Sequence, residues 1–238
     1  MKKLTLLLSS FFFLLSACSP KATATPQSPA ATRPTGPQTL TVMTHDSFAA
    51  SDAVVKSFEA ANNAKLVFLK SGDAGAALNK AILTKNAPLA DVFYGVDNTF
   101  LTRALGADIY ETYASPALAD IPSNFKLDPS NRALPVDYGD VCINYDKAYF
   151  ADHHLAVPQN LDDLKKPEYA GLLVTENPAT SSTGLAFLLA TVAHYGDSFM
   201  DYWKALKANK VVVVDGWETA YYTNFSASSG HGPQPMVV

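Results

Sequence analysis

The sequence has little cysteine, so disulfide bonds contribute nothing to its predicted fold. Its 238 residues include two cysteines, Cys18 and Cys142. Cys18 falls at the end of a leader described below, which leaves a single thiol and no intrachain disulfide even in an oxidising compartment. The folded part must therefore be stabilised by its hydrophobic core, and a chain of this length with 48% hydrophobic residues is able to bury one.

Basic charge is also scarce. The formal net charge is −4, and removing Lys2 and Lys3 with the leader leaves 16 basic and 22 acidic residues, a formal charge of −6. Proteins that bind nucleic acid usually carry a basic patch that neutralises phosphates. The composition therefore argues against a nucleic-acid partner.

The motifs of common enzyme classes are missing as well. Cysteine and histidine do not occur at zinc-ligand spacing, and Asp152–His154 is typical of a solvated loop. A secreted hydrolase using Ser181 or Ser182 is the strongest enzyme alternative, but the Gly-x-Ser-x-Gly elbow is absent. The consecutive residues His45–Ser47 cannot form a catalytic triad without unusual folding. We therefore predict a binding protein rather than an enzyme.

The N-terminus reads as an export and anchoring segment. Residues 1–17 have a basic start, an apolar middle and a small-residue exit, which is typical of a secretory signal peptide. The exit Leu15-Ser16-Ala17-Cys18 resembles the lipobox of bacterial lipoproteins, in which the cysteine is lipidated after cleavage. The alternative is an ordinary signal peptide with a stray cysteine. Residues 18–38, rich in Pro, Ala, Thr and Ser, then form a flexible tether from the lipidated Cys18, and acyl chains would hold the protein at the outer face of a membrane.

Residues 39–138 show alternating strand and helix patterns. Strands are expected at 39–44, 65–70 and 90–94, and helices at 49–61, 74–83 and 98–105. This alternation predicts parallel βαβ units with right-handed crossovers, and therefore a first α/β lobe. Ligands of open α/β sheets collect at the carboxyl ends of the strands, here residues 45–47, 71–73 and 95–98.

Residues 139–238 are predicted to form a second α/β lobe. After an irregular stretch over 111–131, short strands are expected at 133–136 and 141–144, then at 172–175 and 211–214, with helices at 184–194, 199–206 and 217–225. The apolar residues Met236–Val238 predict the start of a further strand. We expect from this that both lobes are incomplete at the C-terminus.

One corner of the second lobe, residues 172–189, combines a strand, a loop of small hydroxyl residues and a helix. Ser and Thr at a helix start satisfy free backbone N–H groups, and those groups together with the helix dipole form a seat for an anion. Ser181, Ser182, Thr183 and Gly184 occupy this position. The alternative is a capped helix without a ligand.

Five segments in succession resemble the substrate-binding proteins of bacterial ABC importers, and within these the thiamine-binding subgroup. They read TVMTHDSFA, ADVFYGVDN, PVDYGDVCINYDK, NPATSSTGLAFLLATVAHYGD and VDGWETAYYTNF, and the resemblance covers residues 39–238. It implies a two-lobe, type II periplasmic-binding-protein fold, C-terminally truncated, that binds thiamine or its phosphate esters between the lobes. It also implies a membrane permease as partner, a place in the cell envelope, and no cofactor or metal.

The same resemblance implies which residues face the ligand. Asp73 would meet a cationic or amino-pyrimidine group, and Ser181, Ser182, Thr183 and Gly184 would hold a hydroxyl or phosphate end. Trp217 and Tyr221 lie four apart on one helix face and would offer aromatic surface to a flat cationic ring. The remaining ligand-binding positions follow the first strand: His45, Asp46 and Ser47.

Local structural roles compete with several of these assignments. Asp46 and Ser47 would equally well cap the first helix, and Asp73 the second, while Trp217 would fit a core position. A ferric-ion or polyamine receptor of the same superfamily is the alternative function. Tyr221 and Tyr222 resemble the adjacent tyrosines of the ferric-ion binders.

The lipobox generates a direct test of the anchor. Growth with a radiolabelled fatty acid should label the protein in the membrane fraction, and Cys18→Ser should abolish the label because the acyl acceptor is lost. Labelling that persists in Cys18→Ser would contradict a lipid anchor at this residue.

Overall fold

The structure is a computed structural model that describes residues 36–238. The predicted signal peptide, the lipidation site Cys18 and nearly all of the tether lie outside these residues, so they remain predictions. Among residues 36–238, no helix has both the length and the apolar character needed to cross a membrane.

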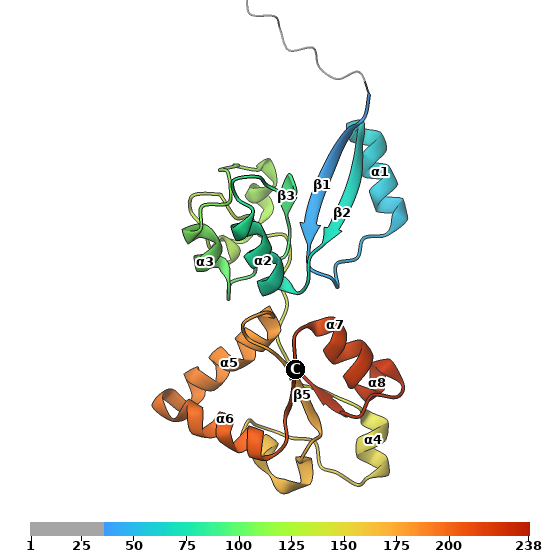
Figure 1. The fold of residues 1–238 in the computed structure, drawn as a ribbon, viewed down its shortest axis with the longest axis vertical. Helices are drawn as coiled ribbons and strands as arrows, with labels where there is room; N and C mark the ends of the chain where they lie inside the picture. The colour runs from blue at the N-terminus through green and yellow to red at the C-terminus, as the bar shows by residue number, and fades with distance from the viewer. Residues whose placement is uncertain (1–35) are drawn as a thin grey trace, which may run out of the picture. The chain divides into compact units, whose positions relative to one another are not determined.

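The first sheet has three strands in the order β2-β1-β3. Strand β1 (Gln38–Thr44) pairs in parallel with β2 (Ala64–Lys70) along its whole length and with β3 (Val92–Phe93) at its carboxyl end. The predicted parallel βαβ arrangement is therefore confirmed. Figure 1 shows β1 and β2 side by side, with the helix that connects them packed alongside.

Helices connect these strands at the predicted places. Helix α1 (Asp52–Asn62) begins after Ser51, whose hydroxyl accepts a hydrogen bond from Val54 N, and α2 spans Ala74–Leu83 as predicted. Because Ser51 is the cap of α1, the alternative that Asp46 and Ser47 cap this helix is wrong. Helix α3 covers Leu101–Gly106. We call this sheet with α1–α3 the first lobe.

An irregular segment follows the first lobe. It contains two 3₁₀ turns, Pro116–Asp120 and Ser123–Phe125, and the carboxylate of Asp128 orders the next turn by accepting hydrogen bonds from the backbone N–H groups of Ser130, Arg132 and Ala133. The strand predicted at 133–136 is wrong: this segment forms no strand and pairs with none among the described residues. Its residues are apolar, but Pro135 has no backbone N–H to donate to a neighbouring strand.

The second sheet has four strands in the order β4-β7-β5-β6. Strand β5 (Leu173–Glu176) pairs in parallel with β6 (Val212–Val214) and with β7 (Met236–Val237), and β7 pairs antiparallel with β4 (Asn144–Tyr145). The apolar end of the chain thus lies inside this sheet, where Met236 and Val237 are fully buried. Figure 1 shows the C-terminus beside β5.

Helices and turns surround this sheet and form with it what we call the second lobe. The longest, α5 (Ser182–Tyr195), and α6 (Phe199–Ala208) agree with prediction. The helix predicted at 217–225 divides into α7 (Trp217–Thr219) and one π-helical turn over Ala220–Asn224. The remaining elements are α4 (Lys147–Asp152), α8 (Ser226–Ser229) and the 3₁₀ turns Asp163–Lys165, Pro167–Tyr169 and Gly196–Ser198.

Each lobe has its own core, and an apolar side chain of the second lobe packs against the core of the first. The main cluster of the second lobe is built on Phe187, Tyr202 and Leu206, where α5 and α6 pack on the sheet. The cluster of the first lobe contains Leu78 and Phe100. Leu185, from the first turns of α5, packs against this first-lobe cluster, so apolar contact also holds the two lobes together.

Candidate functional site

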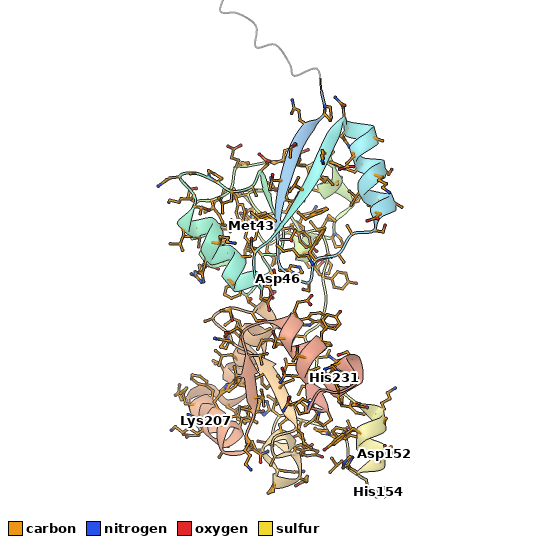
Figure 2. The ribbon with its side chains drawn as sticks, turned by 45° about the vertical axis from the view of Figure 1, so that its right-hand side comes forward. Met43, Asp46, Asp152, His154, Lys207 and His231 are labelled. Atoms are coloured by element: carbon orange, nitrogen blue, oxygen red, sulfur yellow. The ribbon has the colours of Figure 1, made fainter. Side chains whose placement is uncertain are left out.

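The carboxyl ends of β1 and β2 are joined by a pair of hydrogen bonds. Asp46 N donates to Gly72 O at 2.9 Å, and Gly72 N donates to the Asp46 carboxylate at 2.8 Å. Figure 2 shows Asp46 at the end of the first sheet. The side chain of Ser47 pairs with His45 Nδ1 at 2.8 Å. These bonds fix the loop that the sequence predicts to face a ligand.

His45 belongs to an aromatic group behind this loop. Its ring lies 5.8 Å from Tyr94 and 6.4 Å from Phe48, and Gly95 leaves room for it, since a Cβ there would approach the imidazole to 2.8 Å. Burial, and then the hydrogen bond from the Tyr94 hydroxyl to Asp137, raise the pKa of Tyr94 to about 12. Tyr94 therefore keeps its proton, and the three rings pack together behind the loop.

Asp73 connects the two lobes through its carboxylate. One oxygen accepts from Ala74 N at 2.7 Å and caps α2, and the other accepts from Trp217 N at 2.9 Å, at the start of α7. The predicted capping role is thus confirmed, and a second helix start shares the same carboxylate. A carboxylate at a helix N-terminus is stabilised by the free N–H groups and by the helix dipole.

A second contact between the lobes runs through the backbone of Thr180. Its carbonyl accepts from Gly75 N at 2.8 Å and from Ala76 N at 3.2 Å, both in the first turn of α2. Its hydroxyl donates to the carbonyl of Asp215 at 2.7 Å. The loop before α5 is therefore tied both to the first lobe and to the loop before α7.

These contacts border a cavity of about 320 Å³ that is open to solvent. Four of its eleven lining residues are acidic and none is basic. The acidic residues come from both lobes: Asp46 and Asp73 from the first, Asp215 and Glu218 from the second. A cavity of this size and charge suits a small cationic molecule.

Aromatic surface borders the cavity on the second lobe. Trp217 lines it, and its ring stacks on that of Tyr221 at 4.2 Å with an interplanar angle of 21°. The Tyr221 hydroxyl accepts a hydrogen bond from Asn144 Nδ2 at 2.5 Å. Trp217 is half-buried and absent from the core clusters, so the structure does not support a core role for it.

The start of α5 forms a compact group of hydroxyls. Ser181 is fully buried, and its Oγ lies 2.9 Å from Thr183 Oγ1 without capping the helix. Gly184 is required for packing, because a Cβ there would lie 2.3 Å from the carbonyl oxygen of Glu176. The predicted hydroxyl cluster is therefore present at a helix N-terminus, with its side-chain oxygens turned toward each other rather than to the first backbone N–H groups.

Of the ten residues predicted to bind ligand, four line the cavity: Asp46, Ser47, Asp73 and Trp217. His45 and Tyr221 lie directly behind two of these. The cluster Ser181–Gly184 follows Thr180, which also lines the cavity. The sequence placed Thr180 in the hydroxyl cluster before α5 without assigning it to the ligand. It did not point to Asp215 and Glu218, which lie within two residues of Trp217.

Comparison with known proteins decides the family. Residues 87–221 match the family described as bacterial extracellular solute-binding protein. The chain belongs to this family.

Individual relatives agree with the assignment. The thiamine-binding periplasmic protein of Salmonella typhimurium is 32% identical over 187 residues, covering 76% of this chain and 55% of that protein. The solved structure of a periplasmic thiamin binding protein superposes with a TM-score of 0.71 at 31% identity, covering 84% of this chain and 61% of that one. Iron-bound HitA from Pseudomonas aeruginosa has the same fold, with a TM-score of 0.60 at 21% identity, covering 84% of this chain and 62% of that one. The predicted two-lobe, type II fold is confirmed, and this chain spans little more than half the length of the thiamine-binding relatives.

The shared carboxylate of Asp73 generates a stability prediction. Asp73→Ala removes the acceptor of two helix starts at once and should lower the free energy of unfolding by about 2 kcal/mol. Ser115→Ala, which removes only the hydroxyl that caps the short turn Pro116–Asp120, is the control and should cost about 1 kcal/mol or less. Urea denaturation measures both. An Asp73→Ala variant as stable as the control would show that the inter-lobe bond contributes nothing.

Proposed function

We propose that this protein is the extracytoplasmic substrate-binding component of an ABC importer, which binds thiamine or its phosphate esters between its two lobes and delivers them to a membrane permease. The observation that carries the proposal is the acidic cavity beside the stacked rings of Trp217 and Tyr221. The names of the relatives support it independently.

The chemistry of thiamine fits the two halves of this cavity. A cationic ring is attracted by the face of a tryptophan, by about 0.5–2 kcal/mol depending on how far it is desolvated. The acidic side chains add a negative electrostatic potential, which attracts a cation. An exocyclic amine would find acceptors on Asp46 and Asp73, whose carboxylates keep free lone pairs beyond the backbone bonds they accept.

The start of α5 would hold the other end of the ligand. Ser182, Thr183 and the first backbone N–H groups of the helix suit a hydroxyl or a phosphate ester, and the buried Ser181 hydroxyl holds that of Thr183 in place. His45, Ser47 and Gly184 act indirectly in this proposal, by fixing the first loop and by allowing α5 to pack close to β5.

The alternative ligands fit these observations less well. Tyr221 stacks on Trp217 and bonds Asn144, while Tyr222 is exposed, so the two hydroxyls do not converge. Within residues 36–238, no group of three or more His, Cys, Asp or Glu side chains is placed to hold a metal ion. A polyamine would match the acidic cavity but would gain little from the stacked aromatic rings, so a flat ring is the better match for the whole site.

The tether and anchor belong to the same proposal. Lipidation at Cys18 followed by residues up to 38 would hold the two lobes, placed at 39–138 and 139–238, near the extracytoplasmic face of the membrane. The protein would act there by binding rather than by catalysis.

Calorimetry on the whole chain tests the ligand. Thiamine should bind, and Trp217→Ala should weaken binding at least about tenfold, or ~1.4 kcal/mol, because the aromatic face of the cavity is lost. Tyr113→Ala is the control, since Tyr113 is exposed and lies outside the cavity. Tight ferric-ion binding with no binding of any thiamine form would favour the iron alternative and overturn the proposal.

A further inference from the structure

Glu176 is a buried acid without a partner. It is the last residue of β5, its side chain is fully buried, and neither carboxylate oxygen has a hydrogen-bond partner among residues 36–238. None of the four ion pairs found within residues 36–238 includes it. Burying an ionised carboxylate without a partner costs several kcal/mol. Such a group therefore either takes up a proton and becomes neutral, or gains a partner when a ligand binds.

The position of Glu176 links it to the start of α5. Its backbone and Cβ lie directly against Gly184, where an added Cβ would come within 3.1 Å of Glu176 Cβ. The hydroxyl of Thr183, in the first turn of α5, lowers the pKa of Glu176. The acid therefore lies beneath the same helix N-terminus that the proposed function assigns to the phosphate end of the ligand.

The charged and titratable groups around Glu176 do not neutralise it. Asp73, at the start of α2, is a further negative charge and raises the pKa of Glu176. Tyr221 lies in the turn after α7. Its pKa is raised first by burial and then by the negative charge of Glu176. The α5 start contributes only the uncharged hydroxyls of Ser181 and Thr183. Burial is the largest effect. It outweighs the lowering of the pKa by the Glu176 backbone N–H and by Thr183, so that the pKa of Glu176 is raised to about 7.

We propose that Glu176 couples the binding of an anionic ligand end at the α5 N-terminus to the uptake of one proton. A phosphate ester placed there brings negative charge toward a buried carboxylate, which relieves the repulsion by taking a proton from solvent. The protonated acid then donates a hydrogen bond to the anionic end of the ligand, which the ionised carboxylate would repel. The unphosphorylated alcohol brings no charge and takes up no proton. The site thus distinguishes phosphorylated from free ligand in a pH-dependent way, and this inference rests on the proposed function.

The direction of the pH dependence follows from proton linkage. Because the ester-bound state holds one more proton than the free protein above pH 7, affinity for the ester falls as the pH rises, by up to about tenfold per pH unit. The second ionisation of a phosphate monoester lies near pH 6, so between pH 7 and 8.5 the ligand itself changes little. The titrating group in this range is then on the protein.

Calorimetry of the whole chain with thiamine and thiamine monophosphate tests the inference. Between pH 7 and 8.5 the affinity for the monophosphate should fall at least about fivefold, while that for thiamine should change less than about twofold. Glu176→Gln keeps the shape of the side chain and removes its ionisation, so the loss should disappear. Glu111→Gln, at an exposed position outside the cavity, should still show the fall in affinity between pH 7 and 8.5.

A second measurement needs no variant and guards against misfolding of Glu176→Gln. Titrations at pH 8 in two buffers of different ionisation enthalpy give the protons taken up, which should be about one for the monophosphate and about none for thiamine. Equal pH dependence and equal proton uptake for the two ligands would overturn this inference alone. Absence of binding of both ligands would overturn the proposed function and this inference with it.

Discussion

The carboxylate of Asp73 is the interaction on which the arrangement of the site depends. It accepts one backbone N–H at the start of α2 and another at the start of α7, so a single side chain holds helix ends from both lobes. The carbonyl of Thr180 reinforces the junction with two further bonds from the first turn of α2. Hydrogen bonds to charged groups contribute about 1.5–3 kcal/mol each when buried, and somewhat less here because Asp73 is half-buried.

This junction concentrates negative charge and helix ends in one small volume. The cavity is bordered by the starts of α2 and α7, and Thr180 brings in the loop before α5. Its acidic side chains favour a cation, the α5 start favours an anion, and the stacked rings of Trp217 and Tyr221 favour a flat molecule. A ligand with a cationic ring at one end and a phosphate ester at the other satisfies all three preferences, and Glu176 explains how the anionic end is accepted beside a carboxyl group.

The sequence predicted most of this fold because the relevant signals are local. Helix 74–83 was predicted to the residue, since Asp73 is a strong cap and its apolar residues follow the helical period. The strand at 133–136 failed because a short apolar run does not by itself supply a neighbouring strand, and Pro135 lacks the N–H that such a strand would need. Glu176 was missed for a related reason: nothing in LLVTEN reveals that its last carboxyl group is enclosed by α5 and the turn after α7. Trp217 and Tyr221 were identified from their spacing, whereas the bond from Trp217 N to Asp73 joins residues 144 positions apart and has no sequence signature.

A crystal structure of this protein grown with thiamine monophosphate measures the central claim most directly. The account predicts ligand density in the cavity, with the cationic ring against the face of Trp217 and the phosphate at the N-terminus of α5, within hydrogen-bonding distance of Thr183. Density for the ligand elsewhere on the molecule, with this cavity filled only by solvent, would contradict it.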